Sequence, residues 1–269
     1  MGSSYVFDNA AEREAEQRFG SLAALYDVRT TRFLAATGLA PGWHCLEIGA
    51  GGGSIAAWLA DQVGATGQVT ATDIDPRFLT ALEALGRTNV TVQRHDIAAD
   101  PLPAGRFDLI HARLVFVHLP HADEALGRVV AALVPGGWLV LEDFALDHAS
   151  QFIISVVDPA DEAIVRRALA AQRQLVIGHG AGVGWACGLY QTFHALGLSS
   201  VGMEGQVTVG AGGSTYAHLL QANFTQLRDA LIAGGLITAA ELDHMRALLD
   251  DPAVAISTPV LFTAWGRRP

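Results

Sequence analysis

Short apolar runs alternate with amphipathic stretches through the first 145 residues of the chain. The apolar runs are rich in Val, Ile, Leu and Ala, which is typical of buried strands, and residues between them repeat at helical spacing. The expected strands are 44–50, 67–74, 90–97, 106–116 and 138–144, and the expected helices are 54–64, 76–86 and 121–134. Strands that alternate with helices predict an α/β fold with a doubly wound, mostly parallel sheet covered on both faces.

Helical periodicity dominates the stretch before the first expected strand and much of the chain after residue 145. Residues 9–37 read as helix with Gly20 and Gly38 as stop signals, and Pro135-Gly136-Gly137 reads as a turn. Thr238, with Glu241 three residues later, predicts a capping box. The C-terminal flank predicts helices at 158–178, 189–197, 214–233 and 238–250, and strands at 200–209 and 255–266.

Composition narrows the class of protein. The formal net charge is −10, and all 17 basic residues are arginine, so a phosphate-tracking surface and a nucleic-acid partner are not expected. No apolar run is long enough to span a membrane, and the N-terminus lacks a secretory pattern. Two cysteines, Cys45 and Cys187, do not make a disulfide scaffold. We expect a cytoplasmic protein without a metal site, and a homodimer stays open.

The stretch CLEIGAGGGS, residues 45–54, places Glu47 directly ahead of a glycine cluster. Glycine loses more backbone entropy than other residues, so the cluster indicates a tight strand-to-helix turn or a ligand that lies close. In an open parallel sheet, ligands bind at the carboxyl ends of the strands. The first strand delivers Gly49, Ala50 and Gly51 there, followed by a helix N-terminus at Ser54 that favours polar oxygen.

Acidic residues follow the next two strands. Asp73, followed by Ile74, lies 24 residues after Gly49, where a carboxylate can accept hydrogen bonds from two ribose hydroxyls. Asp96 ends the third strand and could accept from an exocyclic amine, and Ile97 could offer an apolar wall to a purine. The three strand ends therefore predict a nucleoside site.

The type of nucleoside follows from the charges near the turn. A nicotinamide dinucleotide fingerprint has its third glycine where this chain has Ser54, so a dehydrogenase is disfavoured. Glu47 and the other acidic groups suit a cationic ligand better than a pyrophosphate. S-adenosylmethionine fits these groups. Its sulfonium and ammonium are cationic, its adenosine suits Asp73 and Asp96, and its amino-acid part suits the glycine loop.

On these residues the chain resembles the class I S-adenosylmethionine-dependent methyltransferases. The resemblance runs through LEIGAGGGS, TATDIDP, RHDI, FDLIHARLVFVHLP and LVPGGWLVLEDF, over about residues 40 to 145. It implies a seven-stranded sheet whose last strand is antiparallel. It also implies Gly49 and Gly51 against the amino-acid part of the cofactor, Asp73 on the ribose and Asp96 on the adenine amine. His111 or Ala112 would line the methyl-bearing region through the backbone.

Other residues could complete the cofactor site. Arg113 could meet the cofactor carboxylate or pair with an acidic neighbour, and Tyr26 could close over the cofactor or pack a helix on the sheet. Three segments follow from this interpretation. They are the lid helices 1–38, the Rossmann-like cofactor-binding core 39–145, and residues 146–269 with the substrate-side helices and the last two strands.

Asp143, His118 and His179 are the candidate catalytic residues. Asp143 follows the fifth strand and is the first choice for a carboxylate on the substrate side, with a turn cap as its structural alternative. Related sugar O-methyltransferases pair such an aspartate with a histidine where this chain has Val117, so the acid–base pair is incomplete. His118 could act as base or support the loop, and His179 lies in the glycine-rich loop 178–184.

The resulting hypothesis is methyl transfer from S-adenosylmethionine to a small, fairly hydrophobic acceptor, as in bacterial secondary metabolism. Such in-line displacement depends on positioning and on excluding water. Oxygen is the first choice for the acceptor atom, with nitrogen and carbon open. Two alternatives remain: an enzyme that uses the bound cofactor as a scaffold for cyclisation or rearrangement, and a non-catalytic nucleoside-binding protein.

Overall fold

The computed structural model describes residues 12–146 and 153–269, and these form two compact units. The unit we call the sheet unit comprises Tyr26–Phe144, Trp185–Gly205 and Phe262–Pro269. The unit we call the helical unit comprises, within the described residues, the chain up to Leu25, Ala145–Gly184 and Gln206–Leu261. Each unit is therefore built from separate stretches of the chain.

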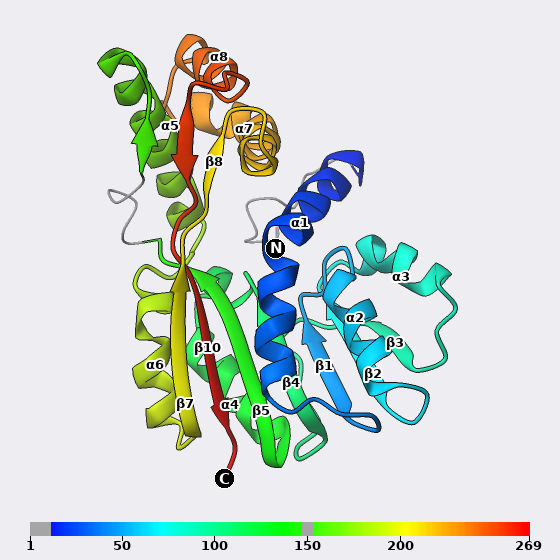
Figure 1. The fold of residues 1–269 in the computed structure, drawn as a ribbon. Helices are drawn as coiled ribbons and strands as arrows, with labels where there is room; N and C mark the ends of the chain where they lie inside the picture. Colours follow the sequence, from blue (N-terminus) through cyan, green and yellow to red (C-terminus); the bar gives the residue numbers. More distant parts are fainter. Residues whose placement is uncertain (1–11, 147–152) are drawn as a thin grey trace. The chain divides into compact units, whose positions relative to one another are not determined.

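The predicted seven-stranded, mostly parallel sheet is confirmed (Figure 1). Its strand order is β3-β2-β1-β4-β5-β10-β7, so the order reverses between β1 and β4. β1 pairs in parallel with both β2 and β4, whereas the arrow of β10 points opposite to that of β5 in Figure 1. The strands are β1 His44–Ile48, β2 Gln68–Asp73, β3 Val90–Arg94, β4 Phe107–Arg113, β5 Leu133–Phe144, β7 Ser199–Gln206 and β10 Leu261–Arg267.

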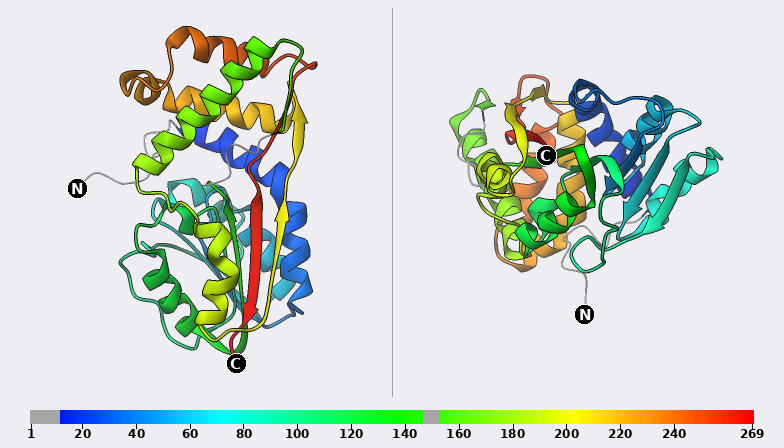
Figure 2. Two further views of the ribbon diagram at one scale, coloured as in Figure 1. Left: turned by 90° about the vertical axis from the view of Figure 1, so that its left-hand side faces the viewer. Right: turned by 90° about the horizontal axis from the view of Figure 1, so that it is seen from below.

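Helices cover both faces of this sheet, as the views in Figure 2 also show. On one face, α1 and α2 pack on Cys45, Leu109 and Val140. On the other face, α4 and α6 pack on Ile110 and Leu141. The helices of the sheet unit are α1 Glu12–Ala36, which begins in the helical unit, α2 Ser54–Val63, η1 Pro76–Leu79, α3 Thr80–Ala84, η2 Phe116–His118, α4 Ala122–Ala132 and α6 Trp185–Ala195.

Besides the first part of α1, the described residues of the helical unit form three helices and a small antiparallel sheet. The helices are α5 Pro159–Gly178, α7 Thr215–Ala233 and α8 Ala239–Leu248, and the sheet has the order β6-β9-β8 with strands β6 Ile154–Ser155, β9 Ala255–Ser257 and β8 Val209–Ala211. α5 packs against α7 and α8. The predicted capping box at Thr238 and Glu241 is confirmed, because each side chain accepts from the other residue's backbone N–H.

Two predicted C-terminal strands were wrong as single elements. Residues 200–209 divide between β7 and β8, and residues 255–266 divide between β9 and β10. Pro259 lies in the second break and has no N–H to donate. At the break, the N–H of Thr258 donates to the carbonyl of Thr208 at 2.7 Å. The apolar pattern continues through both breaks, so periodicity alone does not reveal them.

Local stop signals were also less decisive than the sequence predicted. The first helix continues through Gly20, and the expected helix 76–86 is a short 3₁₀ turn followed by the five-residue α3. The strand expected to run to residue 116 ends at Arg113. β5 begins at Leu133 and passes through the expected turn at 135–137, because a register shift opposite Phe107 and Leu109 absorbs the extra residues.

Within the described residues, the helices are too short or too polar to cross a membrane.

The capping box gives a local test of the fold. Thr238→Ala removes the side chain that accepts the N–H of Glu241, so α8 should lose about 1 kcal/mol of local stability. Hydrogen–deuterium exchange should become faster in the first turn of α8. Thr225→Ala, on an exposed face of α7, is the matched control and should leave exchange in α8 unchanged. Equal exchange in the T238A and wild-type proteins would contradict the role of the cap.

Candidate functional site

The turn between β1 and α2 depends on left-handed glycines. Gly49, Gly51 and Gly53 have φ values of +66°, +50° and +78°. A Cβ at Gly49 would lie 2.3 Å from Cγ2 of Val115, so the loop after β4 also requires a glycine there. α2 begins at Ser54 without a side-chain cap, which leaves its first N–H groups available to a ligand.

Asp73 at the end of β2 is tied to this turn. Its carboxylate accepts the N–H of Gly51 at 2.9 Å and the N–H of Asp75 at 3.0 Å. Burial raises the pKa of Asp73, and the two N–H groups act in the opposite direction. Ile74 beyond it is 47% exposed, which leaves an apolar surface beside the carboxylate. Gly51 and Asp73 therefore form one polar edge between two strand ends.

Asp96 and Ile97 follow β3. The Oδ1 atom of Asp96 accepts the N–H of Ala98 at 2.9 Å, which is the turn-forming contact of the structural alternative. Ile97 is buried, and its carbonyl accepts from Arg128 at 2.6 Å. Turn formation uses one oxygen of the Asp96 carboxylate, so this contact and a ligand contact through the other oxygen are compatible.

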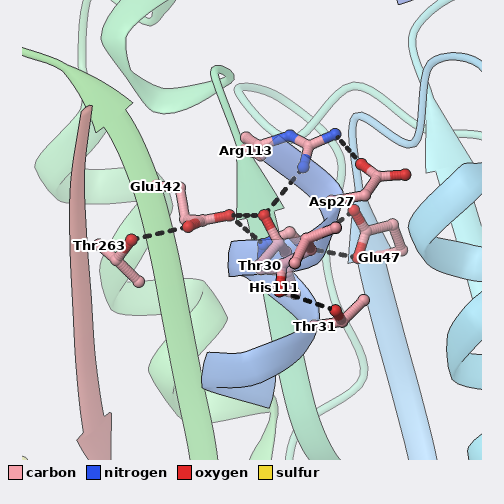
Figure 3. A network of polar contacts seen from close by, with 9 residues as sticks. Asp27, Thr30, Thr31, Glu47, His111, Arg113, Glu142 and Thr263 are labelled. Carbon is pink, nitrogen blue, oxygen red and sulfur yellow. Dashed lines mark hydrogen bonds and ion pairs between the residues drawn. The ribbon is translucent and has the colours of Figure 1, made fainter. Parts of the chain in front are cut away.

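A buried polar network lies on the α1 face of the sheet, just before the strand ends (Figure 3). The Nδ1 atom of His111 lies 2.9 and 2.7 Å from the two carboxylate oxygens of Glu47. Its Nε2 atom lies 3.4 Å from Glu142. Glu47 and His111 are directly paired across β1 and β4, which puts their side chains on the same face. All three side chains are buried.

The network continues into α1 and β10 (Figure 3). Glu142 accepts the hydroxyl of Thr263 at 2.7 Å and also the hydroxyl of Thr30, which is fully buried. Arg113 donates to Thr30 and to Asp27, each at 2.8 Å. Of the two contacts expected for Arg113, the structure contains the pairing with an acidic neighbour. Acidic and basic groups thus alternate from β1 to the helix.

The alternating acidic and basic groups determine the direction in which the pKa of each buried group is shifted. Burial alone would lower the pKa of His111, but the Glu47 and Glu142 carboxylates outweigh it and raise the pKa to about 9. Burial would raise the pKa of Glu142, but the hydrogen bond from His111 dominates and the pKa is lowered. At neutral pH, His111 is therefore an imidazolium between two carboxylates.

Asp143 lies on the opposite face of β5 from Glu142. Its Oδ2 atom accepts the indole N–H of Trp185 at 2.8 Å, and Trp185 stacks on Phe116. Its Oδ1 atom is buried and has no hydrogen-bond partner among the described residues. Burial raises the pKa of Asp143 to about 7, although the hydrogen bond from Trp185 opposes this.

The other candidates occupy three different settings. Tyr26 is 1% exposed and packs edge-on against Phe144 at 5.9 Å between ring centroids. His118 is half-buried in η2 after β4. His179 ends α5 in the helical unit, where its Nδ1 atom lies 2.8 Å from the carbonyl of Leu175. Among the described residues, no group of His, Cys, Asp and Glu could hold a metal ion.

Sequence reasoning missed Glu142, Thr30, Asp27 and the side-chain role of His111. A signal was available for two of them, because His111 and Glu142 each follow directly on an apolar run within a buried strand. A polar side chain in a strand buried on both faces requires a partner. Nothing in the sequence pointed to Thr30 or Asp27, because their contacts depend on how α1 crosses the sheet.

Part of the chain is similar in sequence to known proteins. Residues 46–139 match the family model described as "Methyltransferase domain". The chain is 35% identical to "Methyltransferase str3" of Strobilurus tenacellus, in a match that covers 39% of this chain and 36% of that protein. It is 31% identical to the ubiquinone/menaquinone biosynthesis C-methyltransferase UbiE of Laribacter hongkongensis, in a match that covers 51% of this chain and 62% of that protein. The chain thus spans less than two thirds of each relative.

Solved structures are similar over most of the chain. A candidate methyltransferase of Bacillus halodurans superposes with a TM-score of 0.60 at 16% identity, covering 90% of this chain and 99% of that one. A second structure superposes with a TM-score of 0.52 at 16% identity. It is phosphoethanolamine N-methyltransferase 2 of Haemonchus contortus in complex with phosphomonomethylethanolamine and S-adenosylhomocysteine. That match covers 86% of this chain and 49% of that one. At this identity the likeness establishes the fold.

The close approach at Gly49 gives the first test of the site. Gly49→Ala adds a methyl group against Val115 to a left-handed residue, so it should lower the unfolding free energy by roughly 2–4 kcal/mol. Gly86→Ala is the matched control, because Gly86 is also left-handed but has open space around its Cβ position. We expect G86A to cost only about 1 kcal/mol. Equal thermal midpoints for the two variants would contradict the close approach.

The buried carboxyl of Asp143 gives a test by pH. Because its pKa is raised in the folded state, the folded protein loses stability as pH rises from the unfolded value of 3.8 to about 7. Asp143→Asn keeps an acceptor for Trp185 and has no charge to bury. The thermal midpoint of D143N minus that of the wild type should therefore rise between about pH 4 and about pH 7 and stay level above that range. A difference that is independent of pH would contradict the raised pKa.

Proposed function

Because residues 46–139 match the family model described as "Methyltransferase domain" and the chain has the class I methyltransferase fold, we propose that the protein is an S-adenosylmethionine-dependent methyltransferase. The observation that carries the proposal is the convergence of three strand ends. A glycine turn, Asp73 and Asp96 follow β1, β2 and β3, which are neighbours in the sheet. This is the edge at which ligands of open parallel sheets bind.

The donors and acceptors at this edge fit such a cofactor. The uncapped start of α2 offers N–H groups to a carboxylate, and the remaining lone pairs of the Asp73 carboxylate suit two ribose hydroxyls. Exposed Ile74 suits the face of an adenine ring. When bound, S-adenosylmethionine supplies a methyl group activated by its sulfonium. The chain's own part is to hold the reactants in line and to exclude water.

The proposed cofactor residues follow the three strand ends and the network behind them. Glu47, Ala50 and Gly51 would form the pocket for the amino-acid part, and the backbone of His111 would lie beside the methyl group. The full proposed set is Tyr26, Glu47, Gly49, Ala50, Gly51, Ser54, Asp73, Ile74, Asp96, Ile97, His111 and Arg113. In this proposal, residues 39–145 bind the cofactor, 146–269 supply the acceptor side, and 1–38 form a lid.

The acceptor is proposed to be a small, fairly hydrophobic compound with a hydroxyl group, and oxygen to be the methylated atom. The UbiE relatives, which are C-methyltransferases by name, favour carbon as the second choice. Both reactions gain from removal of a hydroxyl proton. We further propose that the protein is cytoplasmic, bacterial and part of secondary metabolism.

Asp143 is the proposed base for this proton. Its free Oδ1 atom and its pKa of about 7 suit a group that must accept a proton near neutral pH. His118 and His179 are the second choices. In His179, a hydrogen on Nδ1 would donate to the carbonyl of Leu175 and leave Nε2 as an acceptor.

Binding of the demethylated cofactor tests the proposal directly. The wild-type protein should bind S-adenosylhomocysteine in calorimetry, and Asp73→Asn should weaken binding roughly tenfold or more, because one ribose acceptor becomes a donor. Asp61→Asn is the matched control. Asp61 lies on α2 and pairs with Arg87, so this substitution should leave the affinity unchanged. A wild-type protein that binds NADH but neither S-adenosylmethionine nor S-adenosylhomocysteine would overturn the proposal.

The acceptor atom can be read from the product. Incubation with methyl-¹³C-labelled S-adenosylmethionine and hydroxylated aromatic acceptors should give a ¹³C resonance typical of a methoxy group. A resonance typical of a ring methyl group would instead assign C-methylation. Turnover of the acceptor without any labelled product would favour the scaffold alternative.

A further inference from the structure

The glycine turn and the buried network are linked by the loop that follows β4. Leu114 has a left-handed backbone with φ of +58°, which is uncommon for a branched residue, and its N–H donates to the carbonyl of Glu142 at 2.7 Å. The next residue, Val115, packs directly over Gly49. The conformation of the turn is therefore coupled to the position of β4 between β1 and β5.

His111 is the side chain that joins these three strands. It extends from β4 and contacts Glu47 on β1 and Glu142 on β5. Both glutamates are at most 3% exposed, and among the described residues His111 is the side-chain hydrogen-bond partner of Glu47. Glu142 has three further contacts or charges nearby, from Thr30, Thr263 and the guanidinium of Arg113. Loss of His111 would therefore affect Glu47 most.

Removing the positive charge would leave Glu47 as a buried carboxylate without a counter-ion. Breaking one partner of a buried pair is strongly unfavourable, so Glu47 would then take up a proton or leave its position. Either outcome changes the charge and the geometry two residues before Gly49. In the part of the chain that the structure describes, His111 contacts the charged groups of Glu47 on β1 and Glu142 on β5. Through Thr30 the network continues to Arg113 on β4 and Asp27 on α1.

We propose that His111 is a positioning residue for the cofactor: as an imidazolium it clamps Glu47 and Glu142 and thereby fixes the glycine turn that holds the amino-acid part. This inference rests on the proposed function. It assigns a role to the side chain of His111, in addition to the backbone contact expected from the resemblance. The role needs no contact between the ring and the cofactor, because the ring is fully buried.

The test compares pH profiles of affinity. Calorimetry with S-adenosylhomocysteine is performed between about pH 7 and about pH 10 on the wild type, His111→Gln and the control His121→Gln, an exposed histidine before α4. In H111Q, affinity at neutral pH should fall roughly tenfold. In the wild type it should approach the H111Q value as the ring loses its proton near pH 9, whereas H121Q should follow the wild type. The ligand's own ammonium titrates in all three proteins, so it cancels in the comparison.

A measurement on the wild type avoids dependence on the folding of H111Q. The ¹⁵N resonances of the His111 ring should show both nitrogens protonated at neutral pH and should titrate near pH 9, in the range where affinity falls. A neutral ring at pH 7.5, or equal profiles for H111Q and the wild type, would overturn the inference while leaving the proposed function intact. Failure of the wild type to bind at any pH would overturn the proposed function itself.

Discussion

The burial of two glutamates inside the sheet requires a cation between them, and His111 supplies it. A carboxylate without a counter-ion in such a site would take up a proton or prevent the strands from packing. One imidazolium contacts Glu47 and Glu142 at once, and Thr30 and Arg113 carry the alternation of charge into α1. The three central strands and the first helix are therefore joined by charge as well as by apolar packing.

This constraint has consequences at the carboxyl ends of the strands. Because β1, β4 and β5 are held in register, the loop after β4 can place Val115 over Gly49, and the β1–α2 turn then requires glycine. Asp73 fixes the same turn from β2 through the N–H of Gly51. Hydrogen bonds and close contacts within the chain thus define the shape of this turn.

The sequence predicted the existence and order of the first five strands of the sheet, because buried parallel strands give apolar runs. Their bounds were less accurate, since β4 ends and β5 begins earlier than predicted. Asp73 and the glycine turn could be placed from spacing alone. The contacts of Thr30 and Asp27 could not, because residues on a helix reveal their partners only when the crossing of helix and sheet is known. The breaks at Thr208 and Thr258 were hidden for another reason, since the same β-rich pattern runs through two different sheets.

Asp143 illustrates why chemistry at the acceptor side is harder to predict than cofactor binding. Its position after β5 was clear from the sequence, but its indole partner comes from α6, 42 positions along the chain. That contact and the burial around it decide the protonation of the carboxyl, and neither could be derived from the local pattern.

A crystal structure of the protein with S-adenosylhomocysteine would test the central claim most directly. The account predicts the amino-acid part of the ligand against Gly49 and Gly51, ribose hydroxyls on Asp73, the adenine beside Asp96, and His111 still between its two glutamates. Ligand density elsewhere, or a site at this edge in which His111 has separated from Glu47, would contradict it.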